Sequence, residues 1–204
     1  MLDILTKLIT NECTDPKKAA INLIPIVYGS VNQPVKNELI KLYKSVVNDQ
    51  APSVRKEAAI ALNDMILTTP KFPEAMLVDA FKSFYIDSMD SVKMQCIDCC
   101  VSFSKSMPSA QVSSFILPCI KELASTNSWR IRYLVADRIR EISRGLSSET
   151  IKESLLPHYV SFLKDAESEV RTAAVRRMSE FTQILGVQEI VSMVIPCLKD
   201  IQND

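Results

Sequence analysis

Three closely spaced cysteines, Cys96, Cys99 and Cys100, are the residues whose types and spacing could support redox or metal chemistry. A Cys-x-x-Cys pair can supply two zinc ligands, but a tetrahedral site needs four. The sequence offers no second cysteine pair and no nearby histidine. We therefore predict no metal site and no cofactor, and stoichiometric bound zinc would overturn that prediction.

His158 is the only histidine, and the residues around it suggest no partner for acid–base work. A histidine base needs a nucleophile or carboxylate within hydrogen-bonding reach. The chain also lacks a glycine-rich phosphate loop, a nucleophile elbow and a zinc-protease motif. We predict that the protein has no catalytic residues and is not an enzyme.

Trp129 and Arg130 form the pair best suited to binding another protein. Trp129 is the only tryptophan and stands just before Ile131, where an apolar helical pattern begins. Tryptophan and arginine are enriched among the residues that dominate protein–protein affinity. The alternative is that Trp129 simply covers the neighbouring turn.

Composition limits the class of protein. Apolar residues make up 47% of the chain and charged residues 24%, which is typical of globular proteins. The 24 basic and 24 acidic residues balance, which argues against nonspecific nucleic-acid binding. No stretch reaches the roughly 20 apolar residues needed to cross a membrane. The six cysteines lie in apolar stretches, so we predict free thiols and a cytoplasmic protein, with the nucleus as a second location.

Two independent markers repeat with one period. An aliphatic residue followed by a cation recurs at steps of 38, 39 and 39: Val54-Arg55, Val92-Lys93, Ile131-Arg132 and Val170-Arg171. An aliphatic residue followed by proline recurs twice at steps of 39: Leu117-Pro118, Leu156-Pro157 and Ile195-Pro196. Each unit reads as two amphipathic helices joined by a short polar turn. Paired helices of about this length are typical of HEAT repeats.

The pattern predicts an all-α fold, a right-handed α–α superhelix of about five and a half helix pairs. The whole chain, 1–204, would be a single array. Its repeats would be 1–33, 34–71, 72–108, 109–147, 148–186 and the half repeat 187–204. The predicted helices span 1–11, 15–31, 35–48, 52–68, 73–86, 90–106, 110–125, 128–145, 149–164, 167–185 and 187–200. The prolines should bend the first helices, because proline removes a helical hydrogen bond.

The repeat alignment also assigns roles to cysteines and charges. Cys96 and Cys100 fall in core positions, whereas Cys99 shares its position with arginines and is predicted to be exposed. An aspartate stands six residues before three of the cations. In HEAT proteins such an acid and cation form a ladder through the stacked turns. The similarity to HEAT repeats therefore implies a ladder that Thr126 interrupts, with the pairs Asp49/Arg55, Asp87/Lys93 and Asp165/Arg171.

The segment Ser128–Ile142 closely resembles the scaffold (A, structural regulatory) subunit of type 2A serine/threonine protein phosphatases. Ile116–Leu123, Ala166–Ala174 and Ala51–Ala59 share the resemblance, and Val35–Tyr43 does so more loosely. The resemblance implies the middle repeats of a longer array whose intra-repeat turns bind regulatory subunits. The implied contact residues are Pro52, Ser53, Arg55, Lys56, Met89, Asp90, Ser128, Trp129, Arg130, Ala166, Glu167 and Ser168.

The predicted function is therefore that of a non-catalytic scaffold that helps to assemble a phosphatase holoenzyme. Its partners would be proteins, namely a regulatory subunit, and a catalytic subunit only where C-terminal repeats exist elsewhere. We expect neither nucleic acid nor membrane as a partner. A tubulin-binding array, a transport receptor and an enzyme with a thiol site remain alternatives.

Overall fold

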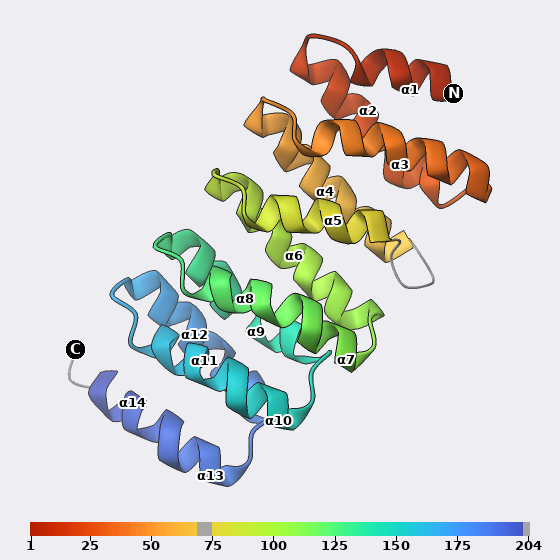
Figure 1. The fold of residues 1–204 in the computed structure, drawn as a ribbon. Helices are drawn as coiled ribbons and strands as arrows, with labels where there is room; N and C mark the ends of the chain where they lie inside the picture. The colour runs from red at the N-terminus through yellow and green to blue at the C-terminus, as the bar shows by residue number, and fades with distance from the viewer. Residues whose placement is uncertain (69–74, 202–204) are drawn as a thin grey trace. The chain divides into compact units, whose positions relative to one another are not determined.

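The computed structural model describes residues 1–68 and 75–201, which group into two compact units. Unit 1 comprises Met1–Ser102 and unit 2 comprises Phe103–Asp204. Within the described residues every regular element is helical (Figure 1). No helix among them is long and apolar enough to cross a membrane. The grouping of all repeats into one array stays a prediction.

Unit 1 is built from alternating first and second helices of the repeats (Figure 1). Helix α2 packs on both α1 and α4, and α3 packs on α4 and α5. The helices are α1 (Leu2–Ile9), α2 (Thr14–Tyr28), α3 (Gln33–Val47), α4 (Pro52–Thr68), α5 (Ala75–Tyr85) and α6 (Asp90–Ser106), whose last turn belongs to unit 2. These bounds lie within a few residues of the predicted ranges. The predicted start of the fifth helix at 73 falls outside the described residues.

Unit 2 repeats the same alternation, with each first helix divided into three consecutive segments. The first helices are α7 (Ser109–Gln111), η1 (Val112–Ile116) and α8 (Leu117–Ala124); α10 (Ser148–Thr150), η2 (Ile151–Leu155) and α11 (Leu156–Leu163); and α13 (Val187–Glu189), η3 (Ile190–Val194) and α14 (Ile195–Ile201). The second helices are α9 (Trp129–Ser143) and α12 (Ser168–Thr182), which pack extensively on each other.

Each recurrent proline of unit 2 follows a π-helical turn. The three π turns η1, η2 and η3 end two residues before Pro118, Pro157 and Pro196. A proline ring clashes with the carbonyl four residues earlier in an α-helix. A π turn adds one residue to the helical turn and so moves that carbonyl away. Each of these prolines is thus accommodated by a local widening of the helix, which repeats with the sequence period. The bend stays a prediction.

The core positions of the repeat are fully buried within each unit. Val54 and Val92 in unit 1, and Ile131 and Val170 in unit 2, are 0% exposed. In each unit, the hydroxyl of a buried tyrosine donates a hydrogen bond to a backbone carbonyl of the following helix. The Tyr43 hydroxyl donates to the Ala58 carbonyl at 2.6 Å, and Tyr159 to the Ala174 carbonyl at 3.0 Å. These bonds fasten a first helix to its own second helix.

The predicted burial of Cys96 and Cys100 is confirmed, but the predicted exposure of Cys99 is wrong. All three side chains are 0% exposed. The Cys99 thiol donates to the Ala59 carbonyl of α4 at 3.5 Å, so it packs between α6 and α4. Among the described residues no three His, Cys, Asp or Glu side chains are placed to hold a metal ion.

Candidate protein-docking site

Aspartates shape the turns between the two helices of a repeat. In unit 1, an Oδ1 oxygen of Asp49 accepts from the Ala51 amide at 2.9 Å, and one of Asp87 accepts from the Met89 amide at 2.8 Å. In unit 2, Asp165 Oδ1 accepts from the Glu167 amide at 3.0 Å. Such Asx turns hold the chain that leads into the second helix. The backbone of each turn is therefore set before any partner binds.

In unit 1 the Oδ2 oxygen of each aspartate forms an ion pair with a basic side chain of the preceding repeat. Lys17 Nζ lies 2.6 Å from Asp49 Oδ2. Arg55 binds Asp87 through two bonds, Nε to Oδ2 at 2.6 Å and Nη2 to Oδ1 at 3.0 Å. Its remaining nitrogen Nη1 donates to the Asp49 carbonyl at 2.8 Å. Arg55 thus ties its own turn to the next one.

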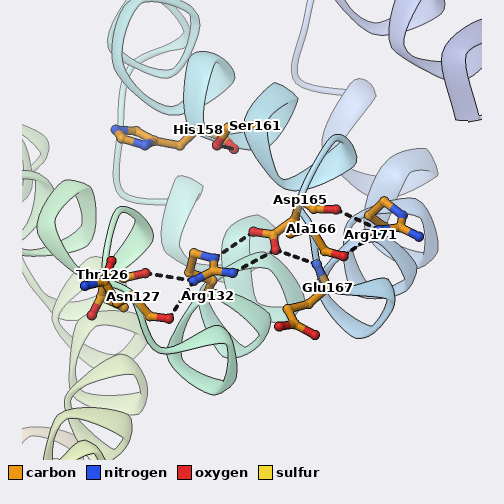
Figure 2. Close-up of polar contacts among 9 residues, drawn as sticks. All are labelled: Thr126, Asn127, Arg132, His158, Ser161, Asp165, Ala166, Glu167 and Arg171. Atoms are coloured by element: carbon orange, nitrogen blue, oxygen red, sulfur yellow. Dashed lines mark hydrogen bonds and ion pairs between the residues drawn. The ribbon is translucent and has the colours of Figure 1, made fainter.

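In unit 2, Arg132 makes the same set of bonds (Figure 2). Its Nη1 donates to the carbonyls of Thr126 and Asn127 at 2.9 and 3.0 Å. Its Nε and Nη2 bind the two carboxylate oxygens of Asp165 at 2.7 and 2.8 Å. Arg171 then donates to the Asp165 carbonyl at 2.7 Å. The turn around Thr126 and the turn around Asp165 are thereby joined.

The predicted ladder pairs were wrong in their partners. Each aspartate pairs with the cation of the preceding repeat. In the turns of Asp49 and Asp165, the cation six residues later, Arg55 or Arg171, donates to the aspartate's backbone carbonyl instead. For the pair Asp87/Lys93, the charge of Lys93 acts on a carboxylate that Arg55 already holds. Thr126 does not interrupt the arrangement at Arg132, because a carbonyl and not a side chain is needed there.

Burial and hydrogen bonding set the charge state of these carboxylates. For Asp165, the bond from Arg132 is the largest influence and holds its pKa below the usual value. For Asp49 and Asp87, burial alone would raise the pKa, but bonds from the cations and backbone amides outweigh it and lower the pKa. All three are therefore ionised at neutral pH, as ion pairing requires.

The predicted docking residues lie on these turns, and most are exposed. In unit 1, Pro52, Ser53, Lys56 and Asp90 are exposed, and Met89 is 42% exposed. Arg55 is half-buried and engaged with Asp87, so its first role is to hold the turns together.

In unit 2, Arg130 is exposed, while Ser128 and Trp129 are half-buried. The Arg130 guanidinium lies over the Trp129 ring, 4.6 Å from its centroid. Such a cation–π contact holds both side chains in one place on the surface. The residues on the next turn, Ala166, Glu167 and Ser168, are exposed.

Lys17 and Arg132 are residues of the turns that the predicted ladder omitted. These residues could have been found from the number of residues that separates each basic residue from the aspartate of the next turn. That distance is 32 residues from Lys17 to Asp49 and from Arg55 to Asp87, and 33 from Arg132 to Asp165. A second period of this kind indicates contact between successive repeats.

His158 lies away from the bonded turn residues (Figure 2). It is half-buried, and burial followed by the charge of Lys121 lowers its pKa. A low pKa keeps the imidazole neutral, which fits a packed helix residue better than a charged contact.

Comparison with known proteins agrees with this architecture. Residues 148–204 match the PPP2R1A-like HEAT repeat family model. The chain is 27% identical over 154 residues to the A-type regulatory subunit of protein phosphatase PP2A from Schizosaccharomyces pombe, covering 74% of this chain and 26% of that protein. A probable serine/threonine-protein phosphatase PP2A regulatory subunit of Caenorhabditis elegans is 30% identical over 119 residues, covering 56% and 20%. The chain thus spans about a quarter or less of the length of these two relatives.

A designed armadillo repeat protein matches the fold, with a TM-score of 0.64 and 16% identity over 100% of this chain and 93% of that one. The predicted all-α repeat fold is confirmed. The relatives are named as regulatory subunits, which agrees with a protein that is not itself an enzyme. The chain is therefore an all-α helical-repeat protein similar to the A-type regulatory subunits of PP2A, with a PPP2R1A-like HEAT repeat at residues 148–204.

Proposed function

We propose that this chain is a non-catalytic scaffold that binds a phosphatase regulatory subunit through its intra-repeat turns. The observation that carries the proposal is the stacked pair Trp129 and Arg130 at the start of α9. The pair combines a large apolar face with an accessible positive charge, a combination enriched at the centres of protein interfaces. The similarity to PP2A regulatory subunits, one of them an A subunit, supports the class of partner.

The hydrogen bonds of Arg132 favour binding at Trp129 and Arg130 without rearrangement of the backbone. Arg132 ties the turn that carries Trp129 to the turn that carries Glu167. The exposed side chains of both turns therefore stand on a fixed backbone, and little ordering is needed when a partner docks. Pre-ordered surfaces bind more tightly because less conformational entropy is lost. The protein would in this way help to assemble phosphatase subunits. We propose that it does so in the cytoplasm and, as a second location, in the nucleus.

The test is the affinity of the purified chain for a phosphatase regulatory subunit, measured by biolayer interferometry. Trp129→Ala and Arg130→Glu should each weaken binding by about 30-fold, the loss typical of a central interface residue. Arg176→Glu is the matched control, since Arg176 is exposed on α12 outside the turns. Circular dichroism should show that all three variants remain folded.

If both turn variants bind as tightly as the wild type, the proposed docking site is wrong. Co-sedimentation with microtubules tests the tubulin-binding alternative. Microtubule binding that is lost on Trp129→Ala, together with no affinity for regulatory subunits, would favour that alternative.

A further inference from the structure

An open groove of about 390 Å³ lies between the second helices α2 and α4 of unit 1. None of the turn residues described above lines it. Its lining comprises Asn22, Pro25 and Ile26 from α2 and Asp64, Leu67 and Thr68 from α4. Ile26 is 69% exposed and Leu67 61% exposed. The groove therefore presents two large aliphatic side chains beside one carboxylate.

The two aliphatic side chains are exceptions to the repeat pattern. Ile26 stands nine residues after the cation Lys17, and the same position in the later repeats is polar: Asp64, Ser102, Glu141 and Glu180. Leu67 stands twelve residues after Arg55, where the other repeats have Gly29, Lys105, Arg144 and Gln183. Exposed helix positions are normally polar, and apolar residues gathered on a surface mark interaction sites. Both exceptions meet in a single groove.

The groove carries a negative charge. Asp64 is exposed there and is the charged side chain among its lining residues. The Lys18 charge on α2 is paired with Asp15 at 2.6 Å. The local field therefore favours a positively charged occupant.

The groove rests on helices that are fastened together. The Ser102 hydroxyl of α6 donates to Asn63 Oδ1 of α4 at 2.7 Å, and the Cys99 thiol donates to the Ala59 carbonyl of α4. Helix α2 packs closely on α4. A surface built on such contacts keeps its shape, which reduces the entropy lost on binding.

We propose that this α2–α4 groove binds a protein segment that presents an aliphatic side chain next to lysine or arginine. The aliphatic side chain covers Ile26 and Leu67, and the basic side chain pairs with Asp64. Acidic segments and anionic membranes are disfavoured by the same carboxylate. None of the six lining residues is among the proposed docking residues of the turns.

The test uses the full chain and a short fluorescein-labelled peptide of alternating lysine and leucine, followed by fluorescence anisotropy. Two further peptides carry glutamate in place of lysine, or serine in place of leucine. The groove variants are Ile26→Ser and Leu67→Gln, which introduce residues that other repeats carry at these positions. Asp64→Asn removes the charge. Val175→Ser, at a 43% exposed valine of α12, is the matched control.

The lysine–leucine peptide should bind the wild type, and each aliphatic variant should bind about tenfold more weakly, as expected for one exposed aliphatic contact. Asp64→Asn should weaken binding and reduce its salt dependence. The control should bind like the wild type. Absence of binding, equal binding by the groove variants, or equal binding of the glutamate–leucine peptide would each overturn the proposal.

Discussion

Gly145, at the end of α9, gives a sharp test of packing in unit 2. A Cβ atom added there would lie 2.5 Å from the Ser104 carbonyl oxygen and 3.0 Å from the Ser104 Cα. Both atoms belong to the backbone, so a side-chain rotation cannot relieve the contact. None of the described residues has a positive φ, so close packing, not backbone conformation, requires glycine at this position.

The magnitude for Gly145→Ala follows from two opposing effects. Forcing extra volume into a packed site costs about 1–3 kcal/mol. Replacing glycine by alanine restricts the unfolded chain and returns about 0.4–1 kcal/mol. We expect a net loss of about 1–2 kcal/mol in the free energy of unfolding, because the end of α9 must move away from Ser104.

Gly29→Ala is the matched control. Its added Cβ would lie 3.9 Å from the nearest atom, Thr68 Cβ, which is an ordinary contact. Gly29 has φ −65° and ψ −23°, a conformation that alanine adopts readily. The same substitution should therefore stabilise the protein by about 0.4–1 kcal/mol at this site.

Urea unfolding followed by far-ultraviolet circular dichroism measures both variants. A Gly145→Ala protein as stable as the wild type, or more stable, would refute the packing argument. Hydrogen exchange adds a local readout, because faster exchange at the last turn of α6 should accompany the displacement of Ser104.

Three further predictions concern charge, hydrogen bonding and thiol reactivity. Asp165→Asn should cost about 1–3 kcal/mol at neutral pH because it leaves Arg132 without its anion. The pKa of Asp165 is lower in the folded protein than its unfolded value of 3.8. Its contribution to the free energy of unfolding is therefore present above pH 3.8 and disappears as the pH falls through the folded pKa. Urea unfolding should show that the wild type and Asp165→Asn become closer in stability in acid. Tyr43→Phe should cost about 1 kcal/mol by thermal or urea unfolding, since it removes a buried hydrogen bond, and an unchanged stability would contradict that account. With Ellman's reagent, exposed Cys13 should react quickly, whereas Cys99, whose thiol pKa is raised by burial, should react only on unfolding; equally fast reaction would contradict its burial.

The helices could be predicted well because two markers with one period fixed the repeat length. Val54 and Ile131 carry the apolar positions of their second helices, and both are fully buried. Leu156-Pro157 marks the middle of a first helix, and it follows a π turn. The π turn itself was not predicted, because proline in a helix can be accommodated by a break, a kink or a widened turn.

Cys99 shows why position in the repeat does not fix exposure. Its register position carries Ala61, Arg138 and Arg177 in other repeats, and the arginines suggested an exposed site. Ala61 is 1% exposed, whereas Arg138 and Arg177 are half-buried. A long side chain can leave the same backbone position and carry its charge to water. The short cysteine side chain stays between the helices, so length and not register decides the outcome.

The spacing within one turn does not predict the ion-pair partners of the ladder. The six residues from Asp165 to Arg171 do bring these two residues together, but through a backbone carbonyl. The carboxylate of Asp165 is bound by Arg132, 33 residues earlier. A local spacing cannot show which of two nearby cations reaches the carboxylate, because that depends on how successive repeats stack.

Arg130 and Arg132 separate the structural and binding roles of one turn. They are two residues apart on a helix, so their side chains leave different faces. Arg132 is half-buried and uses its donors on two backbone carbonyls and Asp165, whereas Arg130 is exposed and stacks on Trp129. Loss of Arg132 should therefore lower stability and partner affinity together, whereas loss of Arg130 should lower affinity alone. This difference assigns the exposed arginine to recognition and the half-buried one to the support of the turn.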